Sequence, residues 1–97
     1  MKTVNLALQI LPVADPQIDT YQLVDAAIAV IAQSGLKYKV CPFETVIEGT
    51  YTEVMEVVEK AQEACFASGA KKMMVYLKIQ REKDRDVRIE DKLEKYE

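Results

Sequence analysis

Two stretches with helical periodicity, each ending at a Ser-Gly-x-Lys tetrapeptide, constrain the fold of this chain most strongly. In both stretches apolar residues recur at spacings of three and four, which predicts a buried stripe on a helix packed against a sheet. The stripes are Val24, Ala27, Ile28 and Ile31, and then Val54, Val57, Val58, Ala61, Ala64 and Cys65. They end at residues 34–37 and 68–71, where Gly35 and Gly69 are typical of the left-handed residue that stops a helix. The repetition indicates two similar halves.

The starts of both helices carry a capping signal. Asp19 is followed three residues later by Gln22, and Thr50 by Glu53, which is the spacing of a capping box. We therefore expect the helices to begin just after residues 19 and 50.

Segments of period two flank these helices and predict strands. Residues 3–10 alternate until Pro12 ends the run, and residues 72–80 form a last long strand. Between the helices lie residues 38–43 and 45–49, which we expect to form a tight hairpin or one bent pair. Pro42 donates no ladder hydrogen bond, so the first of these is an edge strand or ends at the proline.

The order strand, helix, strand, strand, helix, strand predicts an α+β fold, the ferredoxin-like βαββαβ plan. Handed crossovers then place both helices on one face of a four-stranded antiparallel sheet. The 97 residues are enough for one domain, so we treat 1–97 as a single unit.

The composition changes after this plan is complete. Residues 81–86 are all charged, and Ile89, Leu93 and Tyr96 then recur at helical spacing. This pattern predicts a charged C-terminal tail, residues 81–97, with a short amphipathic helix. The alternative is a frayed, solvated end.

Several classes of protein are disfavoured by composition. A net charge of −3 argues against a nucleic-acid surface, and no phosphate-binding glycine loop is present. No apolar run approaches the roughly 18 residues that a membrane span needs. The pattern of the first residues already predicts a strand and contains no separate apolar signal region, so we expect a cytoplasmic protein.

The residue types needed for common catalytic and metal sites are also missing. The chain has no histidine, and Cys41 and Cys65 are isolated, so we predict no metal site and favour two free thiols over a disulfide. No nucleophile–base pair is visible, and an acid–base role for Glu48 is the only weak candidate for chemistry. We expect no catalytic residues and no cofactor.

The face of the sheet turned away from the helices, called here the open face, has a mixed character. The first and last strands are neighbours in this fold, so their outward residues adjoin; these are Asn5, Ala7, Gln9, Met74, Tyr76 and Lys78. A half-apolar face of this kind often meets a second sheet, so we expect a homo-oligomer. The alternative is an antiparallel sheet with one solvated face.

The stretch Thr45-Val46-Ile47-Glu48-Gly49 is the strongest candidate for a binding site. Alternation puts Thr45 and Ile47 on one face of the strand and Glu48 on the other. A carboxylate at the end of an apolar strand must face water, pair with a cation or accept hydrogen bonds from a ligand. We expect the open face to line the pocket, although a bulged strand would reverse the alternation.

Several motifs together resemble the small thiamin-binding protein family, which is similar to the YkoF-type thiamin-binding domains. The motifs are Thr45-x-Ile47-Glu48-Gly49, Glu59-x-Ala61-x-Glu63-Ala64-x-Phe66-x-x-Gly69, Tyr76-x-Lys78-Ile79, Asp84-Arg85-Asp86 and Asp91-Lys92. The resemblance spans nearly the whole chain. It departs at Gln62, where the family often has histidine.

This resemblance implies a non-enzymatic protein that binds thiamin or its pyrimidine moiety, hydroxymethylpyrimidine, as a homodimer or homotetramer with facing sheets. A carboxylate can accept from the pyrimidine amino group or offset the thiazolium charge, and neutral groups and a flat soft surface complete a site. The ligand-binding residues expected from this reasoning are Asn5, Thr45, Ile47, Glu48, Met74 and Tyr76. The alternatives are a small cofactor-free enzyme on a dimeric scaffold of this fold and a structural oligomerisation module.

Overall fold

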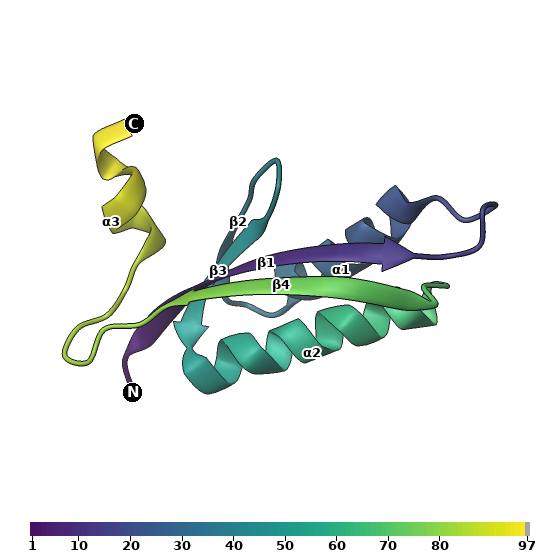
Figure 1. Ribbon diagram of the computed structural model, residues 1–97. Coiled ribbons are helices and arrows are strands. Elements are labelled where there is room, and N and C mark those ends of the chain that lie inside the picture. Colours follow the sequence, from purple (N-terminus) through teal and green to yellow (C-terminus); the bar gives the residue numbers. More distant parts are fainter. Residues whose placement is uncertain (97) are drawn as a thin grey trace.

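The computed structural model describes residues 1–96 and has the element order that the sequence predicts (Figure 1). Its elements are β1 (Thr3–Val13), α1 (Thr20–Gln33), β2 (Lys37–Val40), β3 (Thr45–Thr50), α2 (Tyr51–Ala67), β4 (Lys72–Gln80), α3 (Ile89–Leu93) and a 3₁₀ turn, η1 (Glu94–Tyr96). The expected tail helix is therefore confirmed. No helix in the described part of the chain is long and apolar enough to cross a membrane.

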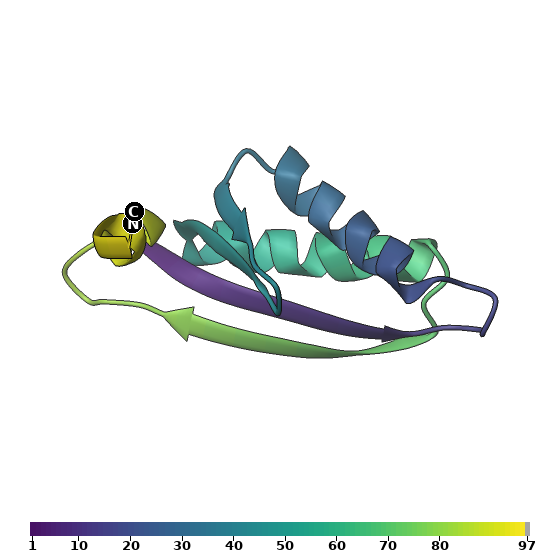
Figure 2. The same cartoon turned by 90° about the horizontal axis from the view of Figure 1, so that it is seen from above.

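The four strands form one antiparallel sheet in the order β2-β3-β1-β4. Figure 2 shows α1 and α2 together on one side of the sheet, with the other side of β1 and β4 left uncovered over most of its length. The ferredoxin-like prediction is confirmed.

Two strand boundaries differ from expectation, and both involve a proline. β1 continues through Pro12 to Val13, because beyond Leu8 its only partner is β4 and an edge tolerates a residue without an amide hydrogen. β2 ends at Val40, earlier than expected. Residues 41–44 form a turn closed by the Cys41 amide, which donates to the Glu44 carbonyl at 2.9 Å. Pro42 suits the second position of such a turn.

The signals at the helix ends are largely confirmed. The Asp19 carboxylate accepts a hydrogen bond from the Tyr21 amide at 2.9 Å and so caps α1. The reciprocal side-chain hydrogen bonds with Gln22 that a capping box would add are not present. The second capping box is complete: the Thr50 amide donates to Glu53 at 2.9 Å, and the Glu53 amide donates to the Thr50 hydroxyl at 3.3 Å. The bond from the Thr50 amide also lowers the pKa of Glu53. Gly35 and Gly69 have φ values of 82° and 123°, in the region that favours glycine.

The core lies between the helices and the inward face of the sheet. Its buried side chains include Val4, Leu6, Leu8, Ile10, Leu23, Ala27, Ile31, Ile47, Val54, Val58, Ala61 and Cys65. The stripe on α1 differs from the prediction, because Leu23 is buried while Val24 and Ile28 are only half-buried. The reason is that Val24 and Ile28 line a surface pocket rather than the sheet.

Candidate functional site

The pairing of β3 decides which of its side chains share a face. Thr45 pairs with Leu8 and Ile47 with Leu6, so both lie on the helix side, where they are 6% and 0% exposed. Glu48 pairs with Asn5 on one side and with Lys37 on the other, so it lies on the open face. The alternation is regular and no bulge reverses it.

The structure divides the six predicted ligand-binding residues among three places. Thr45 and Ile47 lie under the helices, and Asn5 and Glu48 lie at one end of the open face. Met74 and Tyr76 lie at its other end, on β4, where they are 56% and 49% exposed. Met74 pairs with Leu11, six residues from Asn5 along β1, which is roughly 20 Å in a strand. One small ligand therefore cannot contact all six.

A pocket of about 250 Å³, called here the hairpin pocket, opens between α1, β1 and the turn that joins β2 to β3. Thr45 lines it, and its hydroxyl forms no hydrogen bond with residues 1–96 but reaches solvent, because no buried polar side-chain atom among these residues lacks a partner. The walls are mainly apolar and include two exposed aromatic rings, Tyr21 and Phe43. A largely apolar hollow with one free polar group is typical of small-molecule sites.

Glu44 is the charged residue of the hairpin pocket. It also lines a second hollow, of about 290 Å³, which lies on the open face and is called here the open-face hollow. The Glu44 carboxylate forms an ion pair with Lys78 at 3.2 Å. The other residues around the open-face hollow are Asn5, Ala7, Val46, Ile79, Gln80 and Lys92.

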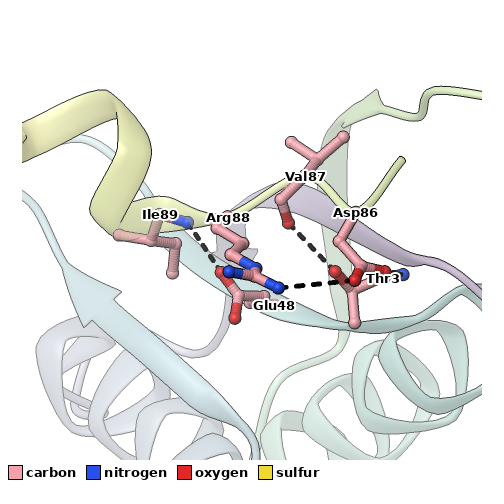
Figure 3. Close-up of polar contacts among 6 residues, drawn as sticks. All are labelled: Thr3, Glu48, Asp86, Val87, Arg88 and Ile89. Atoms are coloured by element: carbon pink, nitrogen blue, oxygen red, sulfur yellow. Dashed lines mark hydrogen bonds and ion pairs between the residues drawn. The ribbon is translucent and has the colours of Figure 1, made fainter.

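The polar groups of Asn5 and Glu48 are already engaged by the C-terminal segment, residues 86–93, called here the strap. Glu48 accepts from the Ile89 amide at 2.6 Å (Figure 3). With its amide oriented to match its neighbours, Asn5 donates to the Val87 carbonyl at 3.0 Å and accepts from the Lys92 ammonium at 2.9 Å. A ligand would have to displace the strap to reach these groups.

The first residue of the strap is held by the start of β1. The Asp86 carboxylate accepts from the Thr3 amide at 2.8 Å, and the Thr3 hydroxyl donates to the Val87 carbonyl at 3.2 Å (Figure 3). The Thr3 amide and the nearby charges of Lys2 and Arg88 keep the pKa of Asp86 below its usual value. Sequence reasoning missed this docking. The available signal was the pair of apolar residues, Val87 and Ile89, within a charged tail.

The remaining residues of interest lie away from these hollows. Gln62, at the position where the family often has histidine, donates to the Val58 carbonyl of its own helix at 3.4 Å. Cys41 and Cys65 are both free thiols. Burial raises the pKa of Cys65, whose thiol donates to the Leu23 carbonyl at 3.2 Å.

Comparisons with known proteins agree with the fold and identify a family. The model of the thiamine-binding protein family matches residues 6–97. UPF0045 protein CPE1503 of Clostridium perfringens is 39% identical over 97 residues, which are 99% of each chain.

Two solved structures resemble the chain closely. A Bacillus cereus domain of unknown function, DUF77, superposes with a TM-score of 0.94 at 35% identity, covering 99% of this chain and 91% of that one. A Thermotoga maritima protein named for thiamine biosynthesis or salvage superposes with a TM-score of 0.86 at 29% identity, covering 98% and 99%.

Proposed function

We propose that this chain, which belongs to the thiamine-binding protein family, binds thiamin or its pyrimidine moiety, hydroxymethylpyrimidine, without transforming it. The observation that carries the proposal is the Thr45 hydroxyl, which forms no hydrogen bond with residues 1–96 and belongs to the lining of a largely apolar pocket. This hydroxyl reaches solvent, so a ligand can replace the water there with a direct hydrogen bond.

The hairpin pocket suits the pyrimidine ring better than the whole vitamin. Its volume of about 250 Å³ is slightly below the roughly 300–1,000 Å³ of pockets for drug-sized ligands. An aminopyrimidine offers both donors and acceptors, and a threonine hydroxyl can pair with either kind. Tyr21 and Phe43 offer flat surfaces to the ring and to a thiazolium cation outside the pocket.

The open face is the less favourable location for this ligand, although Asn5 and Glu48 were expected to bind there. Both residues bind the strap. The ammonium of Lys92 borders the open-face hollow and opposes entry of a thiazolium cation, whereas the charge of Lys78 is offset by Glu44. We therefore assign Thr45 to the ligand, Ile47 to packing, and Asn5 and Glu48 to the strap.

Calorimetric titration with thiamin, hydroxymethylpyrimidine and the isolated thiazole moiety tests this function. We expect thiamin and hydroxymethylpyrimidine to bind with dissociation constants below about 1 mM, which corresponds to about 4 kcal/mol of binding free energy. The thiazole should bind much more weakly, because it lacks the aminopyrimidine. Absence of heat and of a thermal shift with both pyrimidine compounds would refute the proposal.

The site of action that we propose is the cytoplasm. Cys41 and Cys65 are unpaired, and a reducing compartment maintains free thiols. A binder in that compartment would sequester or deliver the vitamin rather than consume it. Incubation with thiamin should return it unchanged, as measured by chromatography.

We also propose a homodimer or homotetramer built on the half of the open face beyond the strap. Leu11, Val13, Met74 and Tyr76 are all exposed there on neighbouring strands. A second copy of the same surface would bury this apolar patch. Tyr76→Glu should lower the mass measured by sedimentation, whereas Tyr21→Glu, on the helix side, should leave it unchanged. A wild-type monomer at about 100 μM would contradict the proposal, since a dissociation constant in that range already corresponds to weak binding.

A further inference from the structure

The strap crosses the whole width of the sheet. The chain leaves β4 after Gln80. The strap then begins with Asp86 and Val87, which contact Thr3 at the start of β1. Ile89 next contacts Glu48 on β3, and Glu90 forms an ion pair with Lys37 on β2 at 3.3 Å. Figure 1 shows α3 lying beside the end of the sheet, far along the chain from the strands that it contacts.

The strap is held by polar contacts with three strands, which include a bond of 3.1 Å from the Val87 amide to the Thr3 carbonyl, and by two apolar side chains. Val87 and Ile89 are buried, but they lie apart from the main core cluster. α3 has only five residues, too few for a helix that is stable by itself. Its N-cap residue, Arg88, provides no side-chain cap, and Glu48 caps the helix from a strand 41 residues away. Docking of α3 therefore depends on the Glu48 carboxylate.

Glu48 has a second partner within reach on the sheet. Lys37 is its direct neighbour across β2 and β3, with both side chains on the open face. In the docked state the Lys37 ammonium binds Glu90, and both of these side chains are about half exposed. If the strap lifts away, Glu90 leaves with it, and Lys37 and Glu48 remain as an opposite-charge pair on adjacent strands. Glu48 then has a partner in both states: the Ile89 amide when the strap is docked and the Lys37 ammonium when it is released.

We propose that residues 86–93 form a releasable strap and that Glu48 switches partners, binding the Ile89 amide when the strap is docked and Lys37 when it is released. Release frees the Asn5 amide and removes Lys92 from the open-face hollow. The switch thus controls access to a hollow on the face opposite the hairpin pocket. It does not depend on whether thiamin binds in that pocket.

The two cations of the strap, Arg88 and Lys92, have partners other than Glu48. Arg88 pairs with Asp86 at 3.6 Å, and both belong to the strap itself. Lys92 binds Asn5 rather than Glu48. Lys37 is therefore the cation best placed to replace the strap at Glu48.

Amide hydrogen exchange on the full chain, followed by NMR, tests the switch with two variants of one ion pair. Glu90→Gln removes a contact made only in the docked state, so exchange of the Ile89 and Val87 amides should speed up about two- to fivefold, the range for an exposed ion pair. In the wild type, Lys37→Met removes this same docked-state pair as well as the released-state partner of Glu48. In the Glu90→Gln background it removes the released-state partner alone, so the same amides should exchange about two- to fivefold more slowly in the double variant than in Glu90→Gln.

The double variant distinguishes a switch from a simple ion-pair attachment. If Lys37→Met does not slow exchange in the Glu90→Gln background, the ion pair only holds the strap in place and the proposal fails. It also fails if the Ile89 and Val87 amides exchange as slowly as those of Leu6 and Ile47, because the strap would then open only on global unfolding. Both substituted side chains are exposed, so the variants should fold.

A second comparison isolates the role of Glu48. With both Glu48 and Glu90 replaced by glutamine, Lys37 has no carboxylate partner in either state, so adding Lys37→Met should not slow exchange. Retention of the full effect of Lys37→Met in that background would overturn the assignment of Glu48.

Discussion

Replacing Ile47 with alanine is expected to lower the free energy of unfolding by about 3 kcal/mol, within the range for a large aliphatic side chain truncated in a core. Ile47 is fully buried between β3 and the helices and pairs with Leu6 on β1. The residue therefore supports the strand that carries Thr45 without reaching a ligand itself. Urea unfolding followed by circular dichroism measures the loss.

Val46→Ala is the matched control for this substitution. Val46 is next in sequence but lies on the open face and is half-buried, so its truncation should cost less than about 1 kcal/mol. If Ile47→Ala instead leaves stability unchanged and weakens thiamin binding, Ile47 would be a wall of the site, and its assignment to the core would be wrong.

Replacing Thr45 with valine is expected to weaken thiamin and hydroxymethylpyrimidine binding about five- to tenfold, the equivalent of one hydrogen bond of about 1 kcal/mol. Valine keeps nearly the same shape, so the pocket should persist. Because the hydroxyl has no protein partner and reaches solvent, the stability of the variant should be nearly unchanged. Parallel titration and thermal unfolding of the two proteins measure both effects.

Glu48→Gln provides the control on the opposite face of the same strand. Glu48 binds the strap rather than the hairpin pocket, so this substitution should leave thiamin affinity unchanged. The reverse pattern, with weaker binding in Glu48→Gln and normal binding in Thr45→Val, would move the ligand to the open face.

Much of the fold could be predicted because its signals are local and repeated. The stripes on both helices, the glycines at 35 and 69 and the Thr50–Glu53 capping box each fix an element by short-range chemistry. The boundary at Pro12 was misjudged for a different reason. Whether a strand tolerates proline depends on whether it has a neighbour at that point, and only the assembled sheet decides this.

The candidate site was harder to predict, because alternation tells which side chains share a face but not which face is covered. The alternation correctly placed Thr45 and Glu48 on opposite faces of β3. The group without a protein hydrogen-bond partner, however, is the Thr45 hydroxyl. The Glu48 carboxylate is not free to accept from a ligand, because it already accepts a hydrogen bond from the amide of Ile89, 41 residues later in the chain. A contact of that separation leaves no periodic signal in the sequence.

A crystal structure of the protein grown with thiamin measures the position of the ligand directly. We expect the pyrimidine ring in the hairpin pocket, with a nitrogen about 3 Å from the Thr45 hydroxyl oxygen and the thiazolium outside the pocket. A pyrimidine bound on the open face against Asn5 and Glu48, with the strap displaced and the hairpin pocket empty, would contradict the proposed site.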